Sequence, residues 1–461
     1  MNKDARYLLT LLAVCVLFGS CRKDVDEDTP RSSDDLDTEL LQILESASNG
    51  AGPGYFKLPA SNAYSEIPQD PENPLTSSKV ELGKFLFHET GIGKNPRLFT
   101  SAEQYSCASC HHAGAGFQAG IAQGIGEGGT GFGFAGEGRT VHPEYFDHPI
   151  WKDSVDVQPI RSPSALNVAF QKNMLWNGQF GATGVNEGTD RLWTAGTPLA
   201  FNHLGFEGVE TQAIAAQEVH RQLVDQDFCT EYSGYMTLFE NAFGEVPESV
   251  DELRIYSGLA IAAYERTLLA NEAPFQKWLS GAYGAMSDAE KRGAMIFFGK
   301  AECATCHTGP ALNSMEFHAY GMNDLFMQGG VIGAAPTSPE NLGRAAFSKD
   351  PADLFKFKVP QLYNLREARL LGHGASFSSI REVVEYKNEG IPQNPMVDAG
   401  HIAPEFTPLF LTQQEVDDLV AFLENGLNDP HLERYVPAEL PSGMCFPNAD
   451  AQSMIDHGCS E

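Results

Sequence analysis

Two amphipathic helices with a shared pattern are predicted ahead of two short cysteine motifs. The first covers Val80 to Phe87 and the second covers Lys291 to Phe298. Each carries an aromatic residue four positions after a glycine, one turn along the same helical face. The capping-box pattern Ser287-Asp-Ala-Glu290 begins the second helix. The repeat indicates an internal duplication.

Each half of the chain is predicted to close with a further amphipathic helix. The first runs roughly from Val250 to Leu269, and the second follows the capping box Thr412-Gln-Gln-Glu415. Glycine and proline between Pro274 and Gly284 predict a hinge between the halves. The pattern divides the chain into residues 51–279, residues 280–430 and a tail over residues 431–461. Alternating apolar and polar runs are rare, so few and short strands are expected.

The N-terminus is typical of an exported lipoprotein. Residues 1–20 have a polar start and an apolar run from Tyr7 that is too short to span a bilayer. Leu17-Phe-Gly-Ser-Cys21 resembles a lipobox, with Cys21 as the lipidated residue; an ordinary cleaved signal with an incidental cysteine is the alternative. Residues 21–50 are predicted to be an acidic, flexible tether. We therefore expect a lipid anchor on the periplasmic side of the cell envelope, at the outer membrane, with surface exposure as the alternative.

The net charge narrows the classes of partner. A formal charge of −30 argues against nucleic acid, because phosphate binding needs clustered lysine and arginine. An acidic surface can steer a basic protein donor, although it is more often a solubility device.

Two CxxCH motifs carry the chemistry. They are Cys107-Ala-Ser-Cys110-His111 and Cys303-Ala-Thr-Cys306-His307. Two thiols at this spacing add to the vinyl groups of haem, and the following histidine supplies imidazole to the iron. A zinc site would need further ligands at regular spacing, and a redox dithiol would need a βαβ context. Together with the repeated helices, the motifs predict a mainly α fold of two class I cytochrome c-like domains, each with one covalent haem c.

Several segments then resemble the bacterial di-haem cytochrome c peroxidases and their MauG-like relatives, from about Leu75 to Leu427. They are Leu82-Gly-Lys-Phe-Leu-Phe87, Ser106 to His111, Arg161-Ser-Pro-Ser-Ala-Leu-Asn167, Leu175-Trp-Asn-Gly178, Ala260-Ile-Ala-Ala-Tyr-Glu-Arg-Thr-Leu268, Asn341-Leu-Gly-Arg344, Phe357-Lys-Val-Pro-Gln-Leu-Tyr-Asn364, His373-Gly374 and Val383-Val-Glu-Tyr386.

The resemblance implies different roles for the two haems. The iron on His111 is expected to meet hydrogen peroxide, and the iron on His307 to relay electrons from a small cytochrome c or cupredoxin. Trp176 matches a tryptophan between the haems and is expected to lie between them and to assist electron passage, with a packed core aromatic as the alternative. A MauG-like oxidase of a protein substrate and a non-enzymatic di-haem electron carrier are the alternative functions. The resemblance also allows a homodimer.

The resemblance places a proton-transferring glutamate in a segment that begins like Glu210-Thr-Gln-Ala-Ile214. Cleavage of the peroxide bond needs a group that takes a proton from one oxygen and returns it to the other. This chain lacks the usual Asn-Pro step, and with a two-residue gap Glu218 takes that position. His220 and Gln217 are its rivals.

The sixth ligands of both irons are also predictions from the resemblance. Many members hold a removable histidine in the loop that corresponds to Gly124–Gly128, where this chain has none, so the iron on His111 is expected to be open at rest unless His142 replaces it. For the second iron, counting places the family's methionine at about Lys387, a poor fit. Tyr386 and Met396 are equal candidates, and a thioether would raise the reduction potential whereas a tyrosine oxygen would lower it.

Calcium and a disulfide complete the expectations. Family members hold calcium between the domains through an Asn-Ser-Pro segment, but Arg161 replaces the asparagine here, which leaves only backbone oxygens and water as ligands. In an oxidising compartment Cys445 and Cys459 can close a C-terminal loop, which leaves Cys229 free.

Overall fold

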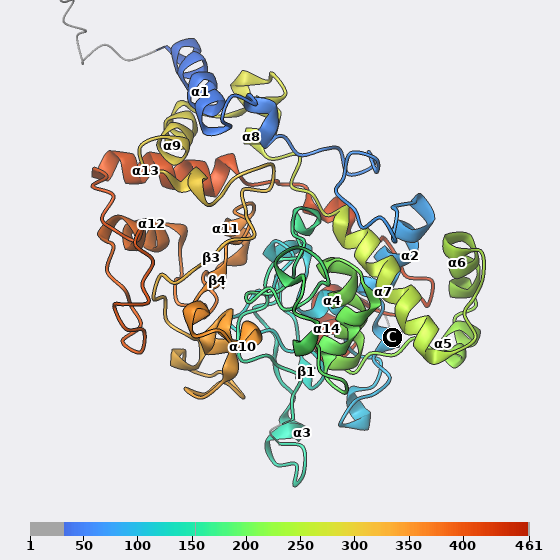
Figure 1. Ribbon diagram of the computed structural model, residues 1–461. Coiled ribbons are helices and arrows are strands. Elements are labelled where there is room, and N and C mark those ends of the chain that lie inside the picture. Colours follow the sequence, from blue (N-terminus) through green and yellow to red (C-terminus); the bar gives the residue numbers. More distant parts are fainter. Residues whose placement is uncertain (1–31, 153, 460–461) are drawn as a thin grey trace, which may run out of the picture.

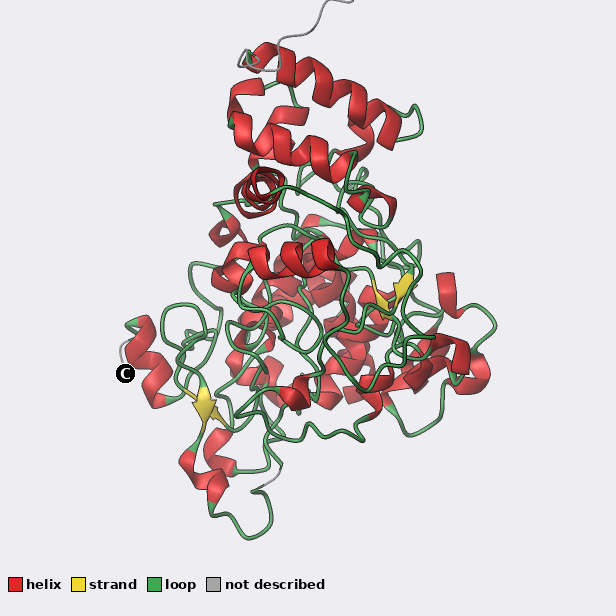
Figure 2. Cartoon of the chain, turned by 90° about the vertical axis from the view of Figure 1, so that its left-hand side faces the viewer, coloured by secondary structure: helices red, strands yellow, loops and turns green. Residues whose placement is uncertain are grey.

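Helices make up most of the regular structure in the computed structural model, which describes residues 32–152 and 154–459 (Figures 1 and 2). The helices are α1 Ser33–Ala47, α2 Ser77–His88, α3 Pro143–Phe146, α4 Gly208–Val219, α5 Gln226–Glu231, α6 Gly234–Phe243, α7 Val250–Arg266, α8 Pro274–Leu279, α9 Asp288–Phe298, α10 Ala345–Ser348, α11 Leu365–Ala368, α12 Ile380–Glu389, α13 Gln413–Ala421 and α14 Ala451–His457. Long loops and short 3-10 turns join them.

Within these residues the strands are short and paired. β1 Gly129–Thr130 lies antiparallel to β2 Thr140–Val141, and β3 Phe317–His318 lies antiparallel to β4 Phe357–Lys358. The prediction of a mainly helical fold with few short strands is confirmed.

The two halves repeat one helix crossing. In the first half α2 packs on α7, and in the second α9 packs on α13. A Cβ atom added to Gly83 would lie 1.8 Å from the carbonyl oxygen of Ala260, and one added to Gly293 would lie 2.0 Å from that of Asp418. Each crossing therefore needs a glycine where the two backbones meet. The duplicated sequence pattern corresponds to this duplicated packing.

One hydrophobic core runs through both halves. Phe87 and Phe117 of the first half belong to the same buried cluster as Phe298 and Phe422 of the second. The segment expected to be a hinge forms α8, and its Trp278 is completely buried in this core. α8 packs against residues of both halves. The segment predicted to be a hinge is therefore a helix of the core.

The predicted flexible tether is wrong over the length of α1. Ser32 and Asp35 form a capping box at its start, and Asp37 binds Lys291 of α9 with 2.7 Å between carboxylate oxygen and Nζ. The leucines that face the core are Leu36, Leu40 and Leu44. Because these leucines are four residues apart, they form one apolar stripe along the helix. Burial of this stripe stabilises the helix in spite of the acidic charge of the segment.

The C-terminal tail returns to the first half, whereas α1 packs on the second (Figure 1). Asn448 accepts a hydrogen bond from Ser109, inside the first CxxCH motif, at 2.5 Å. Asp450 forms a buried ion pair with Arg139 at 3.4 Å. The tail is thus part of the surroundings of the first motif rather than an appendage.

The cysteine prediction is confirmed. Cys445 and Cys459 form a disulfide, and Cys229 is buried and free. The predicted signal and Cys21 lie outside the described residues. Among the residues that are described, no helix is both long and apolar enough to cross a membrane.

Substitution of either crossing glycine should destabilise the fold. For Gly83→Ala and Gly293→Ala we expect the free energy of unfolding to fall by about 1–3 kcal/mol, as in other overpacked cores. The backbone oxygen opposite each glycine cannot move aside, so this cost exceeds the helix-propensity gain of ~1 kcal/mol for alanine. Urea unfolding of the haem-loaded protein measures the change. Gly284→Ala is the control, because nothing lies within 4 Å of its added Cβ; equal stability of all variants would contradict the crossing argument.

Candidate haem sites

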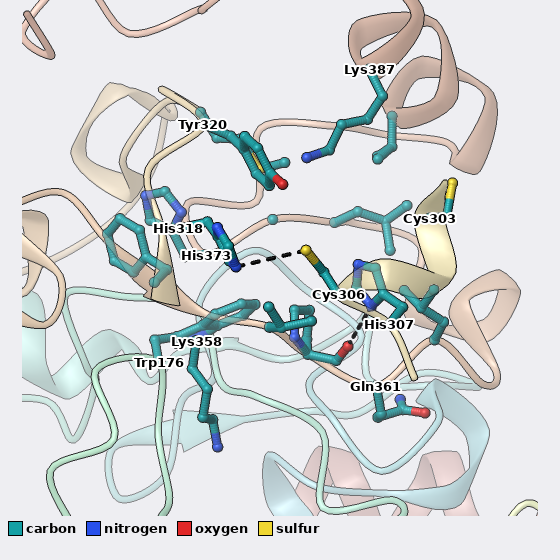
Figure 3. Close-up of a pocket in the computed structure, with 18 of the residues that line it drawn as sticks. Trp176, Cys303, Cys306, His307, His318, Tyr320, Lys358, Gln361, His373 and Lys387 are labelled. Carbon is teal, nitrogen blue, oxygen red and sulfur yellow. Dashed lines mark hydrogen bonds between the residues drawn. The ribbon is translucent and has the colours of Figure 1, made fainter. Parts of the chain in front are cut away.

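A cavity of about 460 Å³ surrounds the second CxxCH motif (Figure 3). Its volume is in the range of about 300–1,000 Å³ that is usual for cofactor and ligand sites. Cys303, Cys306 and His307 line it, and most of the other lining side chains are apolar. Trp176 and Pro163 of the first half line it as well, so the cavity lies where the halves meet.

His307 is held in the form that a metal requires. Its Nδ1 lies 3.1 Å from the carbonyl oxygens of Leu312 and Pro360. Carbonyl oxygens only accept, so Nδ1 carries the proton and Nε2 keeps its lone pair. Burial lowers the pKa of His307 to about 4, which keeps the imidazole neutral. The tautomer, the two thiols and the cavity together fit a covalent haem.

The first motif has the same local arrangement. Cys107 begins the 3-10 turn Cys107–Ser109, and Cys110 caps the end of this turn, which comes after α2 in the chain. His111 Nδ1 lies 3.3 Å from the carbonyl oxygen of Phe117, so Nε2 is again free for a metal. Burial lowers the pKa of His111 to about 4. This motif also fits a covalent haem.

A short backbone segment joins the surroundings of the two motifs. Pro163 lines the second cavity, and its backbone also interacts with the imidazole of His111. The indole Nε1 of Trp176 donates a hydrogen bond of 2.7 Å to the carbonyl oxygen of Arg161 in this segment. The structure thus places Trp176 at the wall of the second cavity, on the side of the first motif. A role in electron passage stays a prediction.

Glu218 is exposed on α4. A carboxylate in open solvent shields no peroxide from water, so the structure does not support it as the proton-transferring group. Its rival Gln217 is buried, but its amide is used in packing on α7, where it donates to the carbonyl oxygen of Arg254 at 2.9 Å and accepts from Ser257 at 2.8 Å.

His220 lies closer to the first motif. Its Nδ1 is 2.9 Å from a carboxylate oxygen of Asp156, and its charge affects His111. Burial lowers the pKa of His220, but the charge and hydrogen bond of Asp156 outweigh this effect and the net pKa is raised. The structure therefore brings His220, but not Glu218, to the first site.

The sequence analysis gave no role to Glu265, although it lies in the quoted Ala260–Leu268 segment. This carboxyl is buried on α7 and affects the charge state of Cys107. Burial, followed by the nearby charge of Glu210, raises its pKa to about 8. Glu210 pairs with Arg266 at 2.6 Å, whereas the side-chain carboxyl of Glu265 has no hydrogen bond or ion pair with another described residue. In the sequence Glu265 is the neighbour of Arg266, yet the fold pairs Arg266 with the distant Glu210.

The loop after the first motif is closed by a buried carboxylate. Glu127 binds the guanidinium of Arg221 and the hydroxyl of Tyr145. His142 is used elsewhere, since its Nδ1 accepts the backbone N–H of Glu144 at 3.3 Å and caps α3. The expectation of an open sixth position on the first iron stays a prediction.

Neither predicted sixth ligand of the second iron lines the cavity. The hydroxyl of Tyr386 is buried and donates to the carbonyl oxygen of Tyr320 at 2.5 Å. Met396 is 50% exposed. Lys387, the residue dismissed as a poor fit, does line the cavity. Tyr386 and Lys387 are neighbours on α12, so their side chains point about 100° apart and only one can face the motif.

Arg161 takes up the carbonyl oxygens around its own position. Its buried guanidinium donates to the backbone oxygens of Ile121, Ala119 and Ala368 at 2.8, 3.1 and 2.9 Å. Burial lowers its pKa to about 10, which still leaves it charged at neutral pH. These oxygens already bind a cation and offer calcium no ligand at this position.

Comparison with known proteins agrees with this arrangement. Residues 77–284 match the family model described as di-haem cytochrome c peroxidase. The methylamine utilization protein MauG of Methylorubrum extorquens is 28% identical over 368 residues, which cover 79% of this chain and 82% of that protein. The cytochrome-c peroxidase IdrP1 of Denitromonas iodatirespirans is 27% identical over 412 residues, which cover 84% of this chain and 90% of that protein.

The fold has a counterpart among solved structures. A crystal structure of a MauG-like protein associated with microbial copper homeostasis superposes with a TM-score of 0.57 at 22% identity, and the match covers 81% of this chain and 95% of the other. Residues 77–284 thus match the di-haem cytochrome c peroxidase family, and the relatives of the chain include both cytochrome-c peroxidases and MauG.

Proposed function

We propose that the protein is a di-haem cytochrome c peroxidase that reduces hydrogen peroxide with electrons from a small periplasmic cytochrome c or cupredoxin. One peroxide, two electrons and two protons give two waters. The observation that carries the proposal is the pair of neutral, Nδ1-anchored histidines, His111 and His307, on either side of the Arg161–Pro163 segment. We propose one class I cytochrome c-like domain around each of them. The haems would supply the iron site for peroxide and the one-electron chemistry.

The surroundings of the two histidines support unequal roles. Around the first motif the chain places the buried carboxyl of Glu265 and the partly exposed imidazole of His220, which pairs with Asp156. The second cavity has mostly apolar walls, and Trp176 lines it on the side of the first motif. Peroxide reduction consumes two protons, so we assign it to the side of His111 and electron relay to the side of His307.

Glu265 is the best placed proton donor. With a pKa of about 8 its carboxyl is protonated at neutral pH, so it can give a proton to a peroxide oxygen and regain it. Because it has no fixed partner among the described residues, no existing hydrogen bond must break before transfer. The adjacent Glu210–Arg266 ion pair joins α4 to α7.

A MauG-like oxidation of a protein residue is the second candidate, and the similarity to MauG supports it. The feature that favoured it was Tyr386 as an iron ligand, and Tyr386 does not line the cavity. A purely electron-carrying protein is the third candidate, although it has no use for buried proton donors beside the first motif.

We further propose that the protein works at the periplasmic side of the envelope, anchored through a lipid on Cys21. The acidic stretch that follows and the disulfide between Cys445 and Cys459 fit an exported protein.

Peroxide-dependent oxidation of a reduced small cytochrome c tests the function. Stopped-flow mixing of the haem-loaded protein with peroxide and the donor should oxidise two donor molecules per peroxide. His111→Ala should reduce the rate to background, because it removes the iron ligand on the peroxide side. If the donor is not oxidised and peroxide gives a stable new spectrum, the MauG-like alternative is favoured. If peroxide leaves the spectrum unchanged, the electron carrier is favoured.

Removal of the proposed proton donor should slow turnover. We expect Glu265→Gln to lower kcat by about 100-fold, the lower end of the usual contribution of a positioned acid. In the unmodified protein kcat should fall as pH rises through about 8, where the Glu265 carboxyl loses its proton, and this fall should vanish in the variant. Glu218→Gln is the matched control and should keep normal turnover, because Glu218 is exposed; the opposite pattern would restore Glu218 as the donor.

Substitution of Trp176 should separate electron delivery from peroxide chemistry. Trp176→Leu removes the ring between the second cavity and the first motif, so donor oxidation should slow. The spectral response of the first haem to peroxide alone should stay unchanged. Stopped-flow traces with and without donor measure both steps, and equal donor oxidation in variant and parent would assign Trp176 a packing role only.

A further inference from the structure

Lys387 extends from α12 into the cavity of the second CxxCH motif (Figure 3). In the close-up its amine points into the open space, and the imidazole of His307 lies on the other side of that space. The two side chains come from separate parts of the second half, one from the motif and the other from the helix that covers it. They thus approach one space from opposite sides.

The amine of Lys387 has no conventional partner. It makes no hydrogen bond or ion pair with another described residue, and its nearest contact is the ring of Tyr320, 2.9 Å from Nζ to the ring centroid. The carboxylate of Glu405, which also lines the cavity, is bound to His318. Desolvation lowers the pKa of Lys387 to about 7, so the neutral amine is accessible at physiological pH.

A second lysine of the same cavity has the partners that Lys387 lacks. Lys358 also lines the cavity and is equally desolvated, but its Nζ donates to Gln171 and, at 2.7 Å, to the carbonyl oxygen of Asn173. Its donors are used within the protein. An unpartnered ammonium in an apolar cavity is costly, whereas an amine that donates its lone pair to a metal is satisfied.

We propose that Lys387 is the second axial ligand of the haem iron at the second motif, opposite His307, and binds through its neutral amine. The nitrogen lone pair forms the bond to iron, and the ammonium releases one proton to solvent as it binds. The inference rests on a covalent haem at Cys303–His307, but it does not rest on peroxide as the substrate.

Two nitrogen ligands would suit an electron relay. With both axial positions filled, the second iron has no place for peroxide, which directs peroxide to the side of His111. A thioether ligand raises the reduction potential, and an amine, a harder donor, gives a lower potential than a thioether in the same site. The ligand thus sets both the selectivity and the driving force of the relay.

Other side chains in the cavity are weaker rivals. Met322 lines it and carries a thioether. His373 is stacked on Phe357 with 3.7 Å between ring centroids, and its Nε2 is 3.1 Å from Asp324. His318 is paired with Glu405. Of these, Met322 is the one whose donor atom is uncommitted, so it must be tested beside Lys387.

Near-infrared magnetic circular dichroism and low-temperature electron paramagnetic resonance of the oxidised, haem-loaded protein test the inference. We expect one low-spin haem with amine and imidazole ligands in the unmodified chain. Lys387→Ala should convert that haem to a high-spin or water-bound form. Lys387→Met should give a thioether spectrum and a higher reduction potential in a potentiometric titration. Met322→Leu, Tyr386→Phe and Met396→Leu are the controls and should leave the low-spin signal unchanged.

An unchanged low-spin spectrum in Lys387→Ala would overturn the proposal, and so would a thioether or phenolate signature in the unmodified protein. The spectrum of the unmodified protein still tests the proposal if the Lys387→Ala variant fails to retain haem. All spectra are recorded without peroxide or donor. A protein with amine ligation that does not oxidise a donor would refute the peroxidase proposal alone, and one that oxidises a donor without amine ligation would refute the ligand alone.

Discussion

The close approach of two helix backbones at a glycine is the contact on which both haem sites depend. Gly83 lets α2 touch the backbone of α7, and Gly293 lets α9 touch that of α13. The helix before each CxxCH motif is thereby fixed against the helix that closes the same half. Any side chain at either glycine would push the two helices apart and move the motif with them. The remaining loops are arranged around these two fixed crossings.

The two CxxCH motifs share one pattern but have different surroundings, because the rest of the chain places different groups beside them. The first lies near the buried carboxyl of Glu265 and the partly exposed His220, which pairs with buried Asp156, and the C-terminal tail packs against it. The second opens on a mostly apolar cavity that contains the unpartnered amine of Lys387. Since each imidazole is anchored by the same kind of carbonyl contact, the difference arises in the wider surroundings and not in the motif.

Buried charges join distant parts of the chain in addition to the shared apolar core. Arg161, from the first half, donates to the backbone oxygen of Ala368 in the second. Asp37 of α1 pairs with Lys291 of α9, and Arg139 pairs with Asp450 of the tail. Removal of one member of such a pair leaves a buried charge unpaired, which is far more costly than loss of an exposed ion pair. Arg161 thus helps to hold the two halves together, whereas the two ion pairs hold α1 and the C-terminal tail in place.

The sequence alone determined what depends on covalent chemistry or on neighbours a few residues away. The CxxCH motifs, the capping boxes at Ser287 and Thr412, the helices over 288–298 and 413–421 and the scarcity of strands are all local properties, and the structure retains them. The sequence also suggested the pairing of Cys445 with Cys459, because few cysteines remained once the motifs were assigned.

Only the tertiary structure decided which side chains face the motifs. Glu218 is exposed whereas Glu265 is buried, and Lys387 rather than Tyr386 enters the second cavity. Successive side chains on a helix point about 100° apart. An error of one residue in a sequence alignment therefore assigns the site to a residue that faces the core. The acidic segment at α1 looked like a tether for a similar reason, since its leucines have no partner until α9 is folded against them. Local sequence therefore specified where the haems attach, and long-range packing specified what each one meets.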